Sequence, residues 1–464
     1  MLAAMTVHNQ KPAVAVVYMA ALFMSVLDTT IVNVALPVVG RDLHASGPGS
    51  VALVSVAYLT SLAVLMPASG WLGDRFGGRT TLLCSVALFT VGSALCGVAP
   101  SLGLLIVFRV LQGAGAAVMT PVGLAMLFRV YPPAERVRVS ALIAGISALG
   151  PALGPVVGGL LTSWVSWRLV FFVNVPVGLA TLLYGMWTLH PHRTVAPERP
   201  DAAGLLLSAV GLGSLMYAVS TGGEQGWAAP AVLVPLIVGL VCFVALVVVE
   251  LRIPDPLLDL RLLGNRMFAC ATSLYGLASV PYLGVLFLAA LFLQDGLGTG
   301  PVRSGLAVFP SALGVLVGGQ LVSRLLYRRF GPRPLATTGL LVIAAALAAL
   351  AGTGDSVDLR LVGVLMAVLG LGVSFVFIPS QVSSMATVEP ERTGRASAIF
   401  TTGKQLGGAV GVSLVGTVTA LAGTGTDGTG TGAYHVAFLV AAAVAVLAVP
   451  VALCIRNADA DATR

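Results

Sequence analysis

Long apolar runs, separated by short polar stretches, follow one another along the whole chain. They fall near residues 13–37, 50–70, 79–99, 101–128, 138–162, 168–189, 202–220, 230–249, 267–293, 303–322, 334–352, 359–380, 396–420 and 433–455. A helix needs about 20 apolar residues to cross the roughly 30 Å hydrocarbon core of a bilayer, and these runs have about that length. The pattern therefore predicts an all-α polytopic membrane protein with fourteen transmembrane helices.

Two longer polar stretches, at residues 190–201 and 250–266, divide the spans into groups of six, two and six. The run at 202–220 is the weakest, so its merger with a neighbour is the alternative to fourteen spans. The expected organisation is a six-helix bundle, a two-helix insert with flanking cytoplasmic linkers, and a second six-helix bundle, at residues 1–189, 190–266 and 267–464.

The composition supports a membrane protein and excludes a soluble one. Hydrophobic residues make up 57% of the chain, charged residues only 9%, and the mean hydropathy is +0.99. A soluble domain carries roughly 25% charged residues, because its surface must face water. Lys11 is the only charged residue before the first apolar run, and no small-residue cleavage site follows that run. The run is therefore expected to be a retained span and not a signal peptide.

The basic residues are unequally distributed between the two sides that fourteen spans would create. With a cytoplasmic N-terminus, nineteen lie on the cytoplasmic side and four on the other. This positive-inside bias predicts that both termini and residue 196 are cytoplasmic, and that residue 426 is outside. The net charge of +7 is scattered and forms no basic stripe, so no nucleic-acid partner is expected. The Lys-poor, Ala-, Val-, Leu- and Gly-rich composition is typical of a GC-rich bacterial genome, and the expected location is a bacterial inner (plasma) membrane.

The two six-span blocks repeat short motifs at equivalent positions. GWLGDRFGGR (residues 70–79), expected as the loop between spans 2 and 3, matches GQLVSRLLYRRFGPR (residues 319–333), with a five-residue insertion in the second block. PPAERVRVSAL (residues 132–142) likewise matches EPERTGRASAI (residues 389–399). Matches at two equivalent places indicate duplicated halves, with the two middle spans inserted between them.

Two charged residues are clear cases inside apolar runs, and Lys404, in the first turns of span 13, is a weaker third. Asp28 lies in span 1 and Arg109 in span 4, and charges in hydrocarbon are costly enough to be functional candidates. A buried carboxyl group can load and release a proton, and a permanently charged Arg beside it can tune that exchange. A purely structural ion pair is the alternative.

Polar and small residues accompany these charges. Gln112 and Gly113 follow Arg109 by three and four residues, so the three share one helix face. That face suits the wall of a central substrate cavity, and Asn33 is the matching candidate in span 1. Gly113 could instead be a packing glycine.

The segment at residues 70–79 is too polar and Gly-rich for a simple connection. Asp74 could cap the next helix, or pair with Arg75, Arg79 or a neighbouring bundle. Together with Gly70 and Gly77, these residues form a candidate cytoplasmic gate that closes in one state and opens in another.

Span 5 carries five glycines and two prolines within residues 145–161. Gly150, Gly154 and Gly158 recur every fourth residue and form a flat ridge for close helix contact. Pro155 removes a backbone hydrogen bond and bends the helix, and Gly159 follows the ridge. The segment is a tightly packed kinked helix, and it could also seal one side and set the direction of transport.

No motif indicates enzymatic chemistry, a cofactor or a metal. A phosphate-binding P-loop, an HExxH motif and a nucleophile with its base are all missing from the sequence, and the five cysteines lack metal-ligand spacing. A membrane-embedded enzyme or a receptor-like sensor would need such a constellation or a soluble signalling domain. ATP-driven transport likewise lacks support.

Taken together, the motifs resemble the major facilitator superfamily, and specifically its fourteen-span drug:proton antiporter branch. LDTTIVNVALP, GWLGDRFGGR, RVLQGAGAA, GPALGPVVGG and WRLVFFVNVP carry the resemblance, at residues 27–37, 70–79, 109–117, 150–159 and 167–176. In the second motif Gly78 stands where a basic residue is usual.

The resemblance implies a monomeric antiporter that exports small amphiphilic organic molecules in exchange for protons by alternating access. It implies proton coupling by Asp28 and Arg109, a cytoplasmic gate at residues 70–79, and an antiport helix at residues 150–159. No acid lies mid-span in spans 10 and 13, so neutral or monocationic substrates are favoured. An importer or uncoupled facilitator of a small metabolite on the same fold is the alternative.

Overall fold

The structure is a computed structural model that describes residues 2–45, 48–191, 201–253, 256–354, 358–423 and 431–463. Within these ranges every regular element is a helix. Residues 196 and 426, whose sidedness the charge pattern predicts, lie outside the described residues.

In the described part of the first block there are eight helices. They are α1 (Leu2–Asp42), α2 (Pro48–Leu65), α3 (Ala68–Phe76), α4 (Gly78–Val98), α5 (Leu102–Val130), α6 (Pro133–Trp164), α7 (Leu169–Phe172) and α8 (Asn174–Thr188).

The middle of the chain adds two helices and a short turn. These are α9 (Ala202–Gln225), α10 (Pro230–Arg252) and η1 (Leu260–Gly264).

The last block contains α11 (Arg266–Leu291), η2 (Phe292–Gly296), α12 (Pro301–Val308), α13 (Pro310–Leu321), η3 (Val322–Leu326), α14 (Tyr327–Phe330), α15 (Pro332–Ala351), α16 (Leu359–Ser384), η4 (Pro390–Arg392), α17 (Thr393–Gly423), α18 (Thr431–Leu447), α19 (Val449–Leu453) and η5 (Ala458–Thr463).

Helix starts follow local chemistry. Ser101, Asp201, Asn265 and Asp358 precede α5, α9, α11 and α16, and each side chain accepts a hydrogen bond from a backbone N–H of the first turn. Proline occupies the first turn of α6, α10, α12 and α15, where its missing N–H has no partner to lose.

The predicted number of spans is confirmed. Among the described residues, thirteen helices are long and apolar enough to cross a membrane, and the bent pair α2–α3 supplies a fourteenth. The two members of that pair meet at an angle of 59°. Every predicted apolar run corresponds to one of these spans, including the weak run at 202–220, which forms most of α9.

The expected loop at residues 70–79 is wrong in one respect, because most of it is helical. Helix α3 covers Gly70 to Phe76, and α4 begins at Gly78. Only Gly77 separates them, with φ 82° and ψ 140°, a conformation that residues with a Cβ avoid. Gly331 makes the same turn before α15, with φ 77°. The repeated motif therefore encodes the same turn in both halves.

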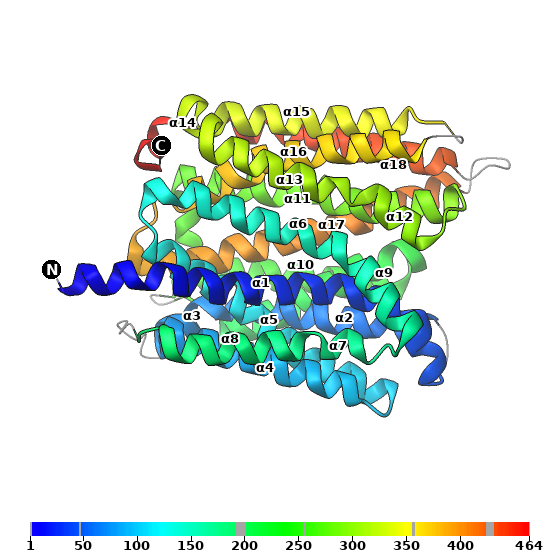
Figure 1. Ribbon diagram of the computed structural model, residues 1–464, viewed down its shortest axis with the longest axis horizontal. Coiled ribbons are helices and arrows are strands. Elements are labelled where there is room, and N and C mark those ends of the chain that lie inside the picture. Colours follow the sequence, from blue (N-terminus) through cyan, green and yellow to red (C-terminus); the bar gives the residue numbers. More distant parts are fainter. Residues whose placement is uncertain are drawn as a thin grey trace.

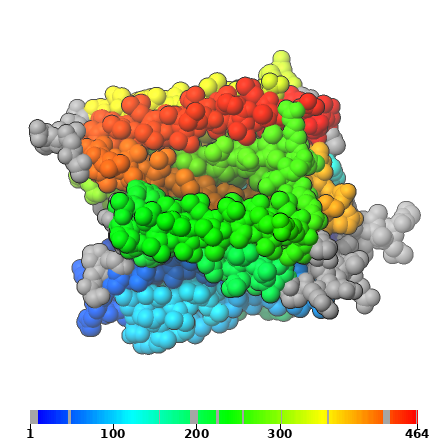
Figure 2. All heavy atoms as spheres, turned by 180° about the vertical axis from the view of Figure 1, so that it is seen from behind, coloured from blue at the N-terminus to red at the C-terminus, as the bar shows by residue number. Residues whose placement is uncertain are grey.

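The helices lie roughly side by side in two stacked groups (Figure 1). The first block forms one group, the last block forms the other, and both chain ends lie at the same end of the bundle (Figure 1). Figure 2 shows α9 and α10, in green, on the opposite face between the two groups. Helix α9 packs against α2 of the first block and α17 of the last, so the insert covers a seam between them.

Candidate functional site

A buried polar cluster lies inside the first six-span block. Asp28 on α1 accepts hydrogen bonds from Arg109 Nη1 at 2.5 Å and from Gln112 Nε2 at 2.8 Å, both on α5. Asn174 on α8 donates to the same carboxylate at 3.1 Å. Ser93 on α4 accepts from both amides, at 3.1 Å from Gln112 and 3.2 Å from Asn174. Three helices thus meet at one carboxylate, and α4 joins them through the bonds of Ser93 to the two amides.

The cluster is sealed from solvent. Asp28 and Gln112 are fully buried, and Arg109 is only 1% exposed. The Arg109 guanidinium lies 4.1 Å from the centre of the Tyr58 ring, and its Nε donates to the Val54 carbonyl at 3.2 Å. A buried charge needs a counter-ion and hydrogen bonds together, and Arg109 has both.

This arrangement can exchange a proton for an ion pair. All three partners of Asp28 donate hydrogen bonds, which suits a carboxylate anion. A proton on Asp28 would compete with the guanidinium for the same oxygens. Arg109 would then turn to its remaining acceptors, which include Gln112 Oε1 at 2.8 Å.

Ser93 and Asn174 are not among the site residues that the sequence predicts. Asn174 lies within WRLVFFVNVP, where an amide in an apolar run was the available signal. Ser93 offered no comparable signal, because a hydroxyl in a membrane helix can bond its own backbone. Only the packing of α4 against α5 and α8 brings it to Gln112 and Asn174.

The three predicted cavity residues lie in different surroundings. Asn33 is exposed, and its Oδ1 accepts from Ser55 Oγ at 2.7 Å. Gln112 belongs to the buried cluster. A Cβ on Gly113 would stand 2.6 Å from the Tyr58 carbonyl oxygen, so this glycine allows α5 to approach α2 closely. Their role in a substrate cavity stays a prediction.

The predicted gate residues lie where α3 meets the start of α17. Asp74 is 8% exposed, and its carboxylate pairs with Arg129 of α5 at 3.4 Å and with Arg395 of α17 at 3.9 Å. The pair with Arg395 joins the two six-span blocks. Gly70 lies beside it, where a Cβ would be 3.0 Å from Arg395 Cα. We call Asp74, Arg129 and Arg395 the latch.

The other gate residues have separate positions. Arg79 donates to the Met186 carbonyl of α8 at 2.7 Å, and Arg75 is exposed. Gly77 makes the turn between α3 and α4. Further bonds join the blocks near the latch: Arg129 donates to the Pro390 carbonyl at 3.2 Å, and Arg136 donates to the Met385 carbonyl at 3.1 Å.

The glycine ridge of span 5 packs against α1. A Cβ on Gly150 would meet the Val26 side chain, one on Gly154 would meet Thr30, and one on Gly158 would stand 2.9 Å from the Ile31 carbonyl oxygen. Each approach is closer than ordinary van der Waals contact.

Two further residues of the predicted antiport helix lie differently. Gly159 has no atom within 4 Å of such a Cβ, so it lies off the ridge. Helix α6 runs without a break past Pro155, whose side chain lies outside the described part of the structure.

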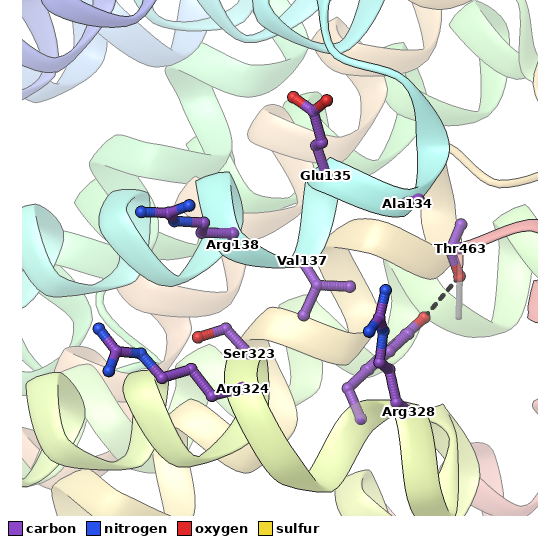
Figure 3. A pocket seen from close by; sticks show the side chains of 9 residues that line it. Ala134, Glu135, Val137, Arg138, Ser323, Arg324, Arg328 and Thr463 are labelled. Carbon is purple, nitrogen blue, oxygen red and sulfur yellow. Dashed lines mark hydrogen bonds between the residues drawn. The ribbon is translucent and has the colours of Figure 1, made fainter.

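A cavity of about 340 Å³ lies between the two six-span blocks, where the start of α6 faces the segment η3–α14. Figure 3 shows Arg138 on α6 and Arg324 on η3 beside it, with Ser323 between them. In the duplicated motifs, Arg138 corresponds to Arg395 and Ser323 corresponds to Asp74. The second half therefore places the two corresponding positions beside one cavity, with a hydroxyl where the first half has the Asp74 carboxylate.

Comparisons with known proteins agree with this architecture. The family model described as Major Facilitator Superfamily matches residues 18–412. The chain is 35% identical over 396 residues to the multidrug resistance protein B homolog of Mycobacterium tuberculosis, covering 84% of this chain and 73% of that protein. It is 35% identical over 408 residues to the puromycin resistance protein pur8 of Streptomyces alboniger, covering 87% and 81%.

A solved structure has the same fold. The human organic anion transporter MFSD10 (TETRAN) superposes with a TM-score of 0.66 at 16% sequence identity, covering 95% of this chain and 99% of that one. The family match extends over most of the chain, and the span count fits it. The chain therefore belongs to the major facilitator superfamily, and it is a membrane transporter and not an enzyme.

Proposed function

We propose that this transporter exports small amphiphilic organic molecules, such as drugs or antibiotics, in exchange for protons. The observation that carries the proposal is the buried Asp28–Arg109 pair with its amide partners. Relatives support the substrate class: besides the multidrug and puromycin resistance proteins, one from Streptomyces glaucescens is named as a tetracenomycin C resistance and export protein, and is 33% identical over 398 residues.

The proposed cycle begins with proton binding at Asp28. The proton weakens the pair with Arg109, so α1 and α5 lose the charged interaction between them. Thr30, two residues further along α1, donates to the Gly150 carbonyl of α6 at 3.1 Å. A movement of α1 is thereby passed to α6, which packs against α13 of the second block.

Alternating access then follows as a rocking of residues 1–189 against residues 267–464, with residues 190–266 as the insert between them. The latch supports this part of the proposal, because Arg395 of one body pairs with Asp74 of the other. We infer that the latch end, where both chain termini lie, faces the cytoplasm, and that the protein acts as a monomer.

The decisive variant is Asp28→Asn, assayed in proteoliposomes with ethidium as a monocationic amphiphile. Wild-type protein should concentrate ethidium only under an imposed pH gradient. The variant should lose this accumulation, while downhill exchange can remain. Asp42→Asn is the matched control, because Asp42 lies on the same helix and bonds Trp167 Nε1 at 2.7 Å, away from the cluster.

Folding must be measured beside transport. Removing one partner of a buried ion pair costs about 3–5 kcal/mol. The double variant Asp28→Asn/Arg109→Gln leaves no unpaired charge and should also lack gradient-driven accumulation. Accumulation equal to wild type in either variant would show that Asp28 is not the coupling acid. Wild-type flux that ignores the pH gradient would instead identify an uncoupled facilitator.

A further inference from the structure

The base of the two-helix insert contains two buried carboxyl groups that face each other. Asp201 immediately precedes α9 and is 9% exposed, and Glu250 near the end of α10 is fully buried. The sequence places both at the edges of polar connections, where acids are ordinary. Their burial arises because α9 and α10 pack along each other.

Each carboxyl group uses one oxygen to hold the local backbone. Asp201 Oδ1 accepts from the Gly204 N–H at 2.8 Å and caps α9. Glu250 Oε2 accepts from the Leu258 N–H at 3.1 Å and fixes the chain that follows α10. These two bonds orient both side chains.

The remaining oxygens, Asp201 Oδ2 and Glu250 Oε1, are buried and have no hydrogen-bond partner among the described residues. Both lie within 2.6 Å of the point that a Cβ would occupy on Gly204. The two oxygens are therefore close together, and only a glycine leaves room for them. Two carboxylates this close in a buried place cannot both stay ionised without a compensating positive charge.

Within the part of the chain that the structure describes, the charges around this pair can be followed element by element. Helix α2, which packs against α9, carries no acid or basic side chain. Besides Glu250, the charged groups on α10 and on the neighbouring elements η1, η4 and α17 are Arg252, Arg261, Glu391, Arg392, Arg395 and Lys404, and Asp259 immediately precedes η1.

Most of these charges are engaged elsewhere. Arg261 donates to the Leu251 and Ile253 carbonyls, and Arg392 pairs with Asp259 at 3.6 Å. Among the described basic residues, Arg395 is near enough to attract Glu250, and it also pairs with Asp74.

We propose that Asp201 and Glu250 share one proton, which makes the base of the insert a second proton-binding site, separate from Asp28. The shared proton joins the two free oxygens by a hydrogen bond and leaves the pair with a single negative charge. Loss of that proton adds a second negative charge beside Arg395 and draws this guanidinium away from Asp74. The insert thereby acts on the latch.

Amide substitutions test the proposal without disturbing the local bonds. In Asp201→Asn and in Glu250→Gln, the amide oxygen keeps the backbone bond and the amide N–H₂ donates to the remaining carboxylate. Both variants should therefore fold. Asp358→Asn is the matched control, because Asp358 caps α16 in the same way and is exposed.

The first readout is infrared difference spectroscopy of the purified protein in lipid, titrated from pH 5 to pH 9. Wild type and Asp358→Asn should show a protonated-carboxyl band that persists above pH 6. Asp201→Asn and Glu250→Gln should each lose this band. The band should remain in Asp28→Asn. Failure of the proposed function, which rests on Asp28, is therefore distinguishable from failure of the shared proton between Asp201 and Glu250.

The second readout is thermal unfolding. A folded state that holds one more proton than the unfolded state loses stability as pH rises. The unfolding temperature of wild type should fall between pH 6 and pH 9 more steeply than that of Glu250→Gln. A protonated-carboxyl band that is retained in both Asp201→Asn and Glu250→Gln would overturn the proposal. So would a band that disappears in Asp28→Asn, equal pH slopes, or a wild-type stability that rises with added Na⁺, K⁺ or Mg²⁺ only when both carboxylates are present.

Discussion

The glycine ridge between α6 and α1 allows a sharp test of the transport cycle, because it offers a neighbouring control. Gly158→Ala places a Cβ 2.9 Å from the Ile31 carbonyl oxygen, whereas ordinary contact begins at 3.4 Å. The two helices must therefore separate locally by roughly half an ångström in a closely packed interior. Gly159→Ala adds the same methyl group to open space.

The expected magnitude follows from two opposing effects. Replacing Gly by Ala inside a helix stabilises it by about 1 kcal/mol in both variants. Overpacking costs about 1–3 kcal/mol, and only Gly158→Ala meets this cost. The two variants should therefore differ by about 1–3 kcal/mol in the stability of any state in which α1 and α6 are in contact. A difference of about 1.4 kcal/mol changes the population of such a state tenfold.

The assay compares gradient-driven ethidium accumulation and thermal unfolding in detergent, at matched expression. Gly159→Ala should transport as wild type and be slightly more stable. Gly158→Ala should be less stable than Gly159→Ala and should transport ethidium more slowly. Gly158→Leu, with a larger side chain, should lose most of the transport. Equal behaviour of Gly158→Ala and Gly159→Ala would refute the reasoning and leave the ridge with no part in the cycle.

Two further predictions concern orientation and the turn that both halves share. The first uses a variant from which the native cysteines have been removed. In intact cells, His190→Cys should be protected from an impermeant thiol reagent, and His44→Cys should be labelled. The reverse pattern would place the latch end outside. Gly77→Ala forces a side chain to φ 82° and should lower stability by about 1–3 kcal/mol in thermal unfolding, whereas Gly103→Ala, with open space around its Cβ, should not; similar unfolding temperatures would contradict the backbone argument.

The span pattern could be predicted from the sequence because it depends on local hydrophobicity alone. The segment at residues 70–79 could not, because glycines and charges are typical of a loop. It is helical because Asp74 finds partners on α5 and α17 that offset its burial. Local sequence carries no information about those partners.

The polar cluster was partly predictable for a related reason. Asp28 and Arg109 are conspicuous because a charge in an apolar run needs an explanation. Ser93 and Asn174 are uncharged, and their importance depends on which helices become neighbours. The pair Asp201–Glu250 gave no signal, because its burial exists only after α9 and α10 have packed together.

Under the proposed function, the position of the insert has a consequence for the route by which an amphiphile leaves the lipid. Helix α10 is the most apolar of the described spans, with a mean hydropathy of 3.2, and only 17% of it is buried within the protein. It therefore presents an apolar surface to the lipid acyl chains, over the seam where α2 faces α17. A molecule that diffuses within the leaflet meets that surface on one side of the protein. No helix in the described ranges covers the seam between α6 and α13 in this way, so the proposed function predicts that lateral access is one-sided.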